Sequence, residues 1–148
     1  MGERREDIIM SYTTERLEQI FDRTSGYCHI CGGKLSFCNY GTYRARGAWE
    51  VEHSIPKCER GTDHLNNLYA AHISCNRGKQ AICTRKARAR NGRTKAPLSS
   101  KRRAAAKSRN AITGGFVGGL LGSIINPWVA VVGAMVGGKK GYDKNPDN

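Results

Sequence analysis

Acidic residues are missing from one long segment of this 148-residue sequence, residues 77–110. The same segment carries 13 of the 25 lysines and arginines and has no aromatic residue. The formal net charge of +13 comes from this segment alone, because residues 1–76 sum to −1 and residues 111–148 to +1. A basic block on an otherwise balanced chain is typical of proteins that bind a polyanion, either nucleic acid or an anionic membrane. The lack of aromatic side chains argues against base stacking in this segment.

Residues 80–110 also contain almost no large apolar side chains. A segment of this composition cannot bury a core, so we expect a basic arm or linker. Residues 99–109 within it are rich in alanine and favour a helix. The many cations would neutralise several phosphates and give salt-dependent binding with little sequence selectivity. We therefore expect the arm to hold the protein on its polyanion.

Charged residues are missing from a second segment, residues 111–138, which is rich in glycine. Its glycines recur every four residues, and this spacing resembles that of glycine-zipper segments in bacterial membrane-associated proteins. The 28 uncharged residues are long enough for a single membrane helix. Alternatively, Asn126-Pro127 makes a turn, and two short helices form a hairpin that packs on itself or on a second copy. The segment is therefore expected to contact a membrane, to contact another copy of the chain, or to pack only on itself.

The sequence begins MGERREDIIM and lacks the continuous apolar run of a secretory signal there. We therefore expect a cytoplasmic protein, or one that is held at a membrane by its Gly-rich end. Six cysteines in a reducing compartment indicate metal ligands or free thiols rather than disulfides. Their spacing decides between these two interpretations.

Two short motifs supply four metal ligands. Cys28 and Cys31 form a C-x-x-C pair, and His72 and Cys75 form an H-x-x-C pair that begins 41 residues after Cys31. Donors of these types at this spacing are typical of tetrahedral zinc, and an ion would stabilise a domain with few large aliphatic residues. We therefore expect a structural Zn²⁺ site. The remaining cysteines are either substitute ligands or free thiols, namely Cys38, Cys58 and Cys83.

Local patterns place these motifs on secondary structure. Residues 13–24 carry apolar side chains at helical spacing, with Thr13 or Thr14 as the N-cap. Residues 37–55 contain β-forming residues separated by glycines, which indicates strands. A final helix is expected over residues 65–79, which would present both ligands of the H-x-x-C pair on one face.

Between the two ligand pairs, polar residues stand in a recognisable order. Glu52 and His53 are adjacent, Asn67 follows in the next loop, and Asn76 comes directly after the last zinc cysteine. This order resembles that of the HNH endonuclease family, and the resemblance covers residues 24–79.

The resemblance implies a fold as well as an activity. We expect a small α+β domain over residues 13–79 with a ββα-metal, treble-clef-like fold: two antiparallel strands, a loop and a helix, braced by structural zinc. Residues 80–110 would then be the basic arm or linker. Residues 111–141 would form a Gly-rich helical hairpin or a single membrane helix.

The family pattern also implies a role for each matched residue. His53 would be the general base that deprotonates water, and Asn67 would fix the loop that orients it. Glu52 and Asn76 would hold a catalytic Mg²⁺ or Mn²⁺, because such ions prefer oxygen ligands. Two residues depart from the family: Glu52 replaces a common Asp, and His72 replaces a common Cys. Nucleic acid would be contacted by basic residues of the last helix and the arm: Arg77, Lys79, Arg85, Lys86, Arg88 and Arg90.

We therefore expect a metal-dependent endonuclease that hydrolyses phosphodiester bonds, with double-stranded DNA favoured over RNA. Two alternatives remain open. One is a non-catalytic, zinc-stabilised adaptor that binds nucleic acid or a membrane. The other is a nuclease toxin or phage-defence effector that uses its Gly-rich tail to reach a membrane. His29 and His64 lack comparable flanking residues and are expected to be structural.

Overall fold

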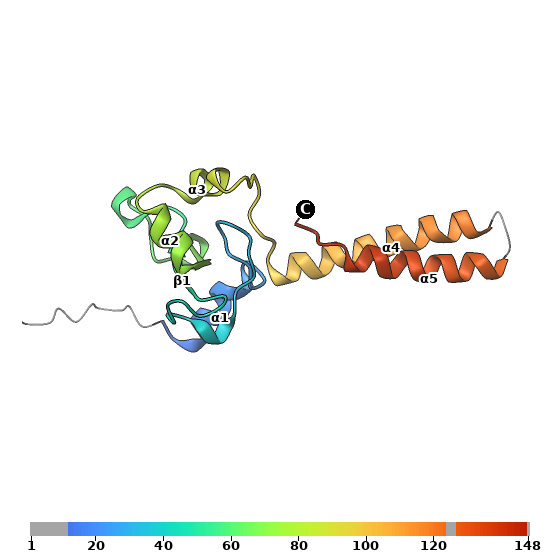
Figure 1. Cartoon of the computed structure of the whole chain (residues 1–148), viewed down its shortest axis with the longest axis horizontal. Helices are drawn as coiled ribbons and strands as arrows, with labels where there is room; N and C mark the ends of the chain where they lie inside the picture. Colours follow the sequence, from blue (N-terminus) through green and yellow to red (C-terminus); the bar gives the residue numbers. More distant parts are fainter. Residues whose placement is uncertain (1–11, 124–126, 148) are drawn as a thin grey trace, which may run out of the picture.

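The computed structural model describes residues 12–123 and 127–147, which form a small α+β domain followed by a long helical hairpin (Figure 1). The domain contains two strands and three α-helices, and the hairpin consists of two further helices. In chain order the elements are α1 (Thr14–Asp22), β1 (Trp49–His53), β2 (Leu68–His72), α2 (Ile73–Lys79), α3 (Thr84–Arg90), α4 (Ser100–Ser123) and α5 (Pro127–Asp143). Three short 3-10 helices lie in the connections: η1 (Phe37–Asn39), η2 (Lys57–Glu59) and η3 (Leu65–Asn67).

Helix α1 matches the sequence prediction closely. The side chain of Thr13 accepts a hydrogen bond from the backbone N–H of Arg16, as an N-cap does. Ile20 is fully buried on the inner face of the helix. Beyond the end of the helix, Gly26 has a φ of +72° and its N–H bonds the carbonyl of Phe21 at 3.1 Å. A Cβ at Gly26 would lie 2.7 Å from the Phe21 ring, so a side chain there would displace that ring.

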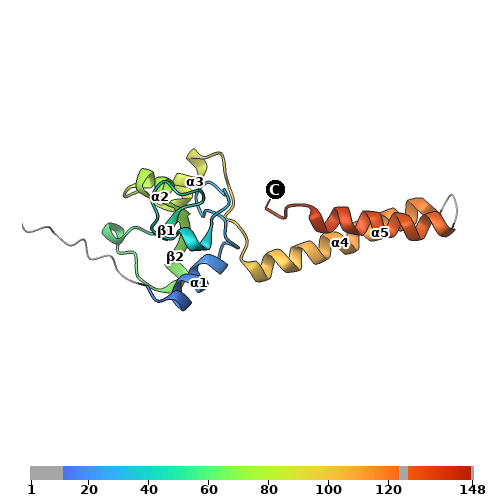
Figure 2. The ribbon, with the colours of Figure 1, turned by 60° about the horizontal axis from the view of Figure 1, so that its bottom comes forward.

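Strands β1 and β2 form an antiparallel two-stranded sheet in which Trp49 pairs with His72 and His53 pairs with Leu68 (Figure 2). Two sequence predictions need correction here. Only residues 49–53 of the segment 37–55 form a strand that pairs in the sheet, and the part before them is a 3-10 helix and a series of turns. The helix expected over residues 65–79 is confirmed only for residues 73–79.

Burial and strand pairing explain why residues 68–72 do not form the helix expected from their sequence. Leu68, Ala70 and Ala71 are all fully buried. Pairing with β1 satisfies backbone polar groups on one edge of this stretch, and on the other edge the carbonyl of Ala70 accepts from the N–H of His29. Leucine and alanine are good helix formers, but tertiary pairing overrides that preference. His72 is consequently the last residue of β2 and the N-cap of α2, rather than a residue inside a helix.

The core of the domain is aromatic around Trp49. Its ring lies 5.1 Å from the Phe21 ring and 4.9 Å from the Tyr40 ring, measured between centroids. The indole N–H of Trp49 bonds the carbonyl of Phe37 at 3.2 Å, so its one polar atom is satisfied although the residue is fully buried. These contacts attach α1 and the turns after it to the start of β1.

A buried ionic cluster closes the other side of the domain. Glu52 is fully buried, and its carboxylate contacts Lys79 Nζ at 3.0 Å, His29 Nδ1 at 3.0 Å and the Thr84 hydroxyl. Lys79 also donates from Nζ to the carbonyl of His53 at 2.7 Å. Burial raises the pKa of Glu52, but hydrogen bonds from His29 and Thr84 and the charges of His29 and Lys79 lower it more, so the net shift is downward.

Helix α3 contributes to this cluster through Thr84. Thr84 and Ala87 of α3 are buried in the domain, although we expected residues 80–110 not to bury a core. Helix α4 runs without a break through residues 110 and 111, where we expected the basic arm to end and the Gly-rich segment to begin. Charged residues cover the exposed side of α3, so the composition of the segment hid its small buried face.

The Gly-rich segment lies in the hairpin of α4 and α5, which projects away from the domain (Figure 1). Pro127 is the first residue of α5, whereas Asn126 of the predicted turn lies outside the described residues. In the described part of the chain, no helix has both the length and the apolar character that a membrane crossing requires. At the base of the hairpin, Asp147 pairs with Arg103 and accepts a hydrogen bond from the N–H of Leu98 at 3.1 Å, which ties the end of the chain back to α4.

The ionic cluster makes a testable stability prediction. Glu52→Gln leaves the buried ammonium of Lys79 without a counter-charge, and losing one partner of a buried pair costs about 3 kcal/mol. Lys79→Met should cost a similar amount, whereas the double variant should be less destabilised than the sum of the two. Urea unfolding at pH 7, followed by circular dichroism, measures these free energies. Strictly additive effects would show that the two charges do not interact.

Candidate metal centre and nuclease site

The four predicted zinc ligands come together from two places in the fold. Cys28 and Cys31 lie on a tight turn that is closed by a hydrogen bond from Cys28 N to the Gly33 carbonyl at 2.7 Å. His72 ends β2 and Cys75 lies in the first turn of α2. The turn is attached to the outer side of β2 through a bond from the N–H of residue 29 to the carbonyl of residue 70 at 2.9 Å. The strand–helix corner, rather than one helical face, presents the second ligand pair.

The ligand atoms form a compact group. The three cysteine sulfurs and one ring nitrogen of His72 all lie within 4.8 Å of one another. The Nδ1 atom of His72 is 3.3 Å from Cys31 Sγ. Tetrahedral zinc with bonds of about 2.3 Å to sulfur holds neighbouring sulfurs roughly 3.8 Å apart. These four residues could therefore bind zinc with only small adjustments.

The electrostatics of the cluster also fit a cation. Hydrogen bonds from Cys31 and Cys75 lower the pKa of Cys28 to about 3, so this thiol ionises first. The resulting thiolate raises the pKa of Cys75 well above its ordinary value, first because Cys75 donates to it and further because the charges repel. All three sulfurs can be thiolates together only with a cation among them. Cys38, Cys58 and Cys83 are free thiols outside this cluster.

The guanidinium of Arg93 packs against Gly32 of the cysteine turn. Gly32 has a φ of +72°, and a Cβ there would lie 2.5 Å from the guanidinium carbon of Arg93. Glycine is therefore required at position 32 for two reasons: the backbone conformation there and the close approach of the arginine. Arg93 belongs to the predicted arm, so this part of the chain also contributes to the packing around the metal cluster.

His53 points outward from the end of β1 and has an acidic partner. Its Nε2 atom lies 2.7 Å from Oδ1 of Asp63, and Lys57 Nζ lies 3.2 Å from the same oxygen. The hydrogen bonds from His53 and Lys57 lower the pKa of Asp63, so the carboxyl is ionised at neutral pH. Sequence reasoning did not assign Asp63 a role, because it lies 10 residues from His53 and no local spacing rule joins the two positions.

Asn67 organises the loop that carries this aspartate. Its amide oxygen accepts from the N–H of Ile55 at 2.8 Å, and its amide nitrogen donates to the carbonyls of Ile55 and Thr62 at 3.1 and 2.9 Å. The side chain is buried, and these bonds hold both ends of the loop 54–63 together. The position agrees with the loop-fixing role that the family pattern implies, which stays a prediction.

Glu52 does not lie where a catalytic cation ligand was expected. Its two carboxylate oxygens are taken by His29, Lys79 and Thr84, and the side chain is fully buried. The ligand role assigned to it from the sequence therefore does not fit this position. Asn76, the other expected ligand, lies beside a different carboxylate.

That second carboxylate is Glu50, two residues earlier on β1. Asn76 donates from Nδ2 to Glu50 Oε1 at 2.9 Å, and Arg77 Nη2 lies 3.4 Å from the other oxygen. Glu50 is partly exposed, with 24% of its side chain accessible, so its oxygens can be reached from solvent. Residues 50 and 52 of one strand point to the same face, so strand alternation places Glu50 on the face of β1 opposite to His53.

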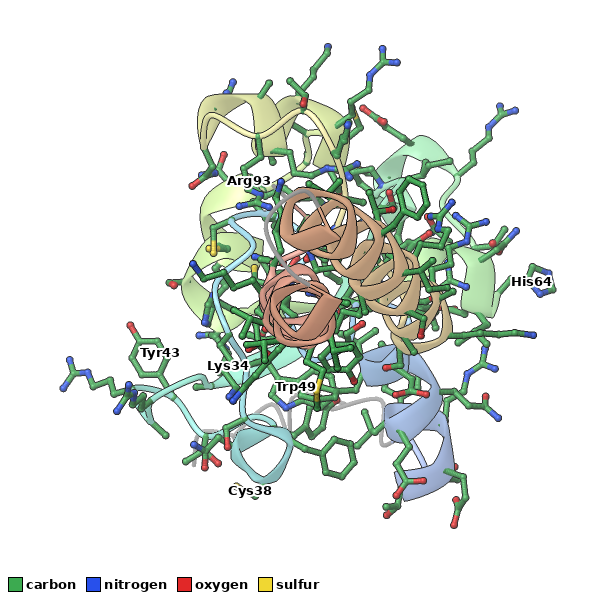
Figure 3. The ribbon with its side chains drawn as sticks, turned by 90° about the vertical axis from the view of Figure 1, so that its right-hand side faces the viewer. Lys34, Cys38, Tyr43, Trp49, His64 and Arg93 are labelled. Carbon is green, nitrogen blue, oxygen red and sulfur yellow. The ribbon has the colours of Figure 1, made fainter. Side chains whose placement is uncertain are left out.

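The predicted nucleic-acid contacts divide into exposed and buried residues. Arg77 has an exposed side chain (65% accessible), and its guanidinium lies 5.5 Å from the ring of Tyr43, which is itself 60% exposed. Tyr43 stands at the margin of the domain (Figure 3). Lys79 is not available for the expected contact with nucleic acid, because the Glu52 carboxylate holds its ammonium in the interior. Of the four expected contacts on α3, Arg88 is half-buried, whereas three are exposed: Arg85, Lys86 and Arg90.

Comparison with known proteins supports this reading of the domain. Residues 28–81 match the family model of the HNH endonucleases. The matched range contains the whole metal cluster and the positions of His53, Asn67 and Asn76, and it is well under half of the chain. It ends before the Gly-rich segment, so the resemblance of that segment to glycine zippers stays a prediction. No curated protein and no solved structure gives a significant match to the chain.

The metal cluster predicts a specific zinc requirement. The purified protein should contain one zinc per chain, and Cys28→Ser should lose it together with most of the folded structure of residues 12–90. The binding energy of a structural zinc, on the order of 10 kcal/mol, is also folding energy. Native mass spectrometry and circular dichroism measure both effects.

Cys58→Ser is the matched control, because Cys58 is an exposed free thiol outside the cluster. This variant should keep its zinc and its fold. Full zinc content in Cys28→Ser would contradict the assignment of the cluster.

Proposed function

We propose that this protein is a metal-dependent endonuclease that hydrolyses phosphodiester bonds in DNA, with His53 as the general base. The HNH domain and its metal cluster support a nuclease-type function. The observation that carries the more specific proposal is the pair of His53 and Asp63 at the exposed end of β1. A histidine held by a carboxylate is suited to accept a proton near neutral pH.

The hydrogen bond assigns the two nitrogens of His53 different tasks. With Nε2–H donating to Asp63, the lone pair of Nδ1 is available for a proton from water. Asp63 then stabilises the imidazolium that forms, as the buried aspartate does in histidine-based hydrolases. Lys57 beside Asp63 and the bonds of Asn67 hold this loop in place.

Glu50 and Asn76 are the residues that would hold the catalytic cation. The Asn76 amide would have to rotate so that its oxygen, in place of Nδ2, faces the ion. Because strand alternation places Glu50 on the face of β1 opposite to His53, the phosphate would have to lie across the edge of the strand to meet both groups. A carboxylate and an amide oxygen are hard ligands, and Mg²⁺ or Mn²⁺ commonly takes one or two protein ligands and completes its shell with water and phosphate. When bound, the cation would stabilise the charge that develops on the phosphate and the leaving oxygen. Arg77 contacts Glu50 now and is exposed, so it can turn toward a phosphate.

The DNA surface would extend from this site over two neighbouring groups. Arg77 and Tyr43 form one, and the ring of Tyr43 can stack on a base or a sugar. The exposed cations of α3 form the other and can contact phosphates along the backbone. Because α3 also contributes Thr84 and Ala87 to the buried interior, DNA binding should be probed there by reversing charges rather than by deletion.

The main test of the proposal is a nicking assay. His53→Ala should reduce cleavage of supercoiled plasmid in Mg²⁺ or Mn²⁺ by about 100-fold or more, since a general base contributes about that factor. Gel electrophoresis over a time course gives the rates. His64→Ala is the matched control, because His64 is an exposed histidine of the same domain (Figure 3). This variant should cleave the plasmid at the wild-type rate. Equal cleavage by both variants, or none by the wild type with either metal, would reject the nuclease.

The Asp63 pair predicts a loss of rate over a defined pH range. The carboxylate of Asp63 stabilises the imidazolium that forms when His53 takes a proton from water. Asp63→Asn should therefore reduce the cleavage rate wherever Asp63 is ionised. The pKa of Asp63 lies below its ordinary value of 3.8, so Asp63 stays ionised across an assay from pH 5 to pH 9 and adds no limb of its own.

Glu59→Gln removes the same charge from an exposed position two residues before Gly61 and is the control for this measurement. It should leave the cleavage rate unchanged at every pH of the assay. An equal loss of rate in both variants would mean that net charge, rather than the contact with His53, sets the rate.

One observation favours a second candidate function. The burial of Glu52 leaves this position without the exposed carboxylate that the family pattern places before its base. A zinc-stabilised module that binds nucleic acid without cutting it would tolerate this arrangement. Such a module would bind plasmid DNA in a salt-dependent manner and give no nicks with any divalent metal.

A further inference from the structure

The α4–α5 hairpin is divided into a basic part and an uncharged part. In α4 the last charged residue is Arg109, and in α5 the first charged residue is Lys139. The residues between these two positions carry no charge in the sequence. The hairpin therefore has two boundaries between charged and uncharged residues, one on each helix.

The packing of the helices places the two boundaries at the same level. A Cβ at Gly138 would lie 3.4 Å from the carbonyl of Ala111, and one at Gly141 would meet the carbonyl of Asn110. The residues around 110 in α4 thus lie directly beside those around 139 in α5. The cations nearest to the boundaries form a basic collar around the hairpin at this level: Lys107, Arg109, Lys139 and Lys140.

Beyond the collar, large apolar side chains face outward. Glycines occupy the contact between the helices, where a Cβ at Gly115 would lie 3.3 Å from the carbonyl of Ala134. The partner helix therefore does not cover the larger residues on the other faces. Ile112, Phe116 and Met135 are 73%, 70% and 72% exposed. Three valines of α5 are also more than half exposed: Val131, Val132 and Val136.

An apolar surface of this extent on a thin hairpin needs an occupant. The domain does not supply one, because the hairpin projects away from it in both views (Figures 1 and 2). The uncharged part of α4, residues 110–123, is about 21 Å long at 1.5 Å per residue. This length exceeds one leaflet of a bilayer but falls short of the full hydrocarbon thickness of about 30 Å.

We propose that the hairpin inserts its uncharged end into one leaflet of an anionic lipid bilayer, with the basic collar among the headgroups. Because the boundaries between charged and uncharged residues lie at the same height on both helices, α4 would enter the bilayer and α5 would leave it on the same side. The chain would therefore not cross the membrane. Anionic headgroups complement the collar, and acyl chains cover the exposed apolar side chains. The described backbone of the apolar zone, residues 110–123 and 127–138, is helical, which keeps its polar groups paired. This proposal is independent of the nuclease activity.

Trp128 provides a direct probe for the full-length protein. It is the second residue of α5, and its side chain lies outside those that the structure describes. The only other tryptophan, Trp49, is fully buried in the domain and should not respond to lipid. Vesicles of equal parts phosphatidylglycerol and phosphatidylcholine should shift the emission to shorter wavelength. Trp128→Phe should bind the same vesicles without the shift.

Met135→Glu tests whether the apolar surface makes the contact. Because Met135 is exposed, its change should preserve the helical circular dichroism and the zinc content while reducing vesicle co-sedimentation at least 10-fold. Phe116→Glu is the second variant at this surface and should behave alike. Thr42→Glu adds the same charge at an exposed position of the domain and should bind normally. Lys139→Glu with Lys140→Glu should remove the preference for anionic over neutral vesicles.

Three results would overturn the proposal. Failure of the wild type to sediment with anionic vesicles would exclude insertion. Sedimentation without a Trp128 shift, and without an effect of Met135→Glu, would show that residues 77–110 merely adsorb to the charged surface. A dimer in sedimentation equilibrium that Met135→Glu dissociates, in a protein that ignores vesicles, would identify a second copy of the chain as the occupant.

Discussion

Four ligand atoms within 4.8 Å of one another join a turn at residues 28–33 to a strand–helix corner more than 40 residues later. These four residues could bind zinc, which would relieve the repulsion by which ionised Cys28 raises the pKa of Cys75. Two other features lie at this junction. The cysteine turn bonds the outer side of β2, and α2 begins directly after the ligand His72. A metal bound by these ligands would stabilise a small domain with a modest core, whereas a larger domain obtains its stability from apolar burial.

Strand β1 shows how the fold separates structure from chemistry. Glu52 and His53 are neighbours, so they point to opposite faces of the strand. Glu52 turns inward and joins β1, α2 and α3 through Lys79 and Thr84. His53 turns outward to Asp63, on a loop that Asn67 holds in shape. The residues best placed for a reaction are therefore those at the surface of β1 and in its following loop.

The contacts that hold the hairpin together differ from those that hold the domain together. Glycine in a water-exposed helix is costly, and here it allows two backbones to approach until a Cβ would collide. Close approach leaves the larger side chains on the outside, uncovered by the partner helix. The same chain therefore combines a domain held by a metal and buried charges with a hairpin whose apolar surface faces away from it. A tie between Asp147 and Arg103 fixes the base of the hairpin.

Patterns that are local in sequence determined the first helix with its Thr13 cap, the four metal ligands and the order of His53, Asn67 and Asn76. Each depends on a spacing or a residue type that neighbouring residues alone define. The tertiary structure decided the rest: β2 replaced a helix because pairing with β1 outweighs helix propensity, and Asp63 reached His53 through a loop. It also buried Glu52 and Lys79 together. In the hairpin, it placed the boundary between charged and uncharged residues of α4 beside that of α5. These outcomes depend on contacts between distant segments, which no local pattern records.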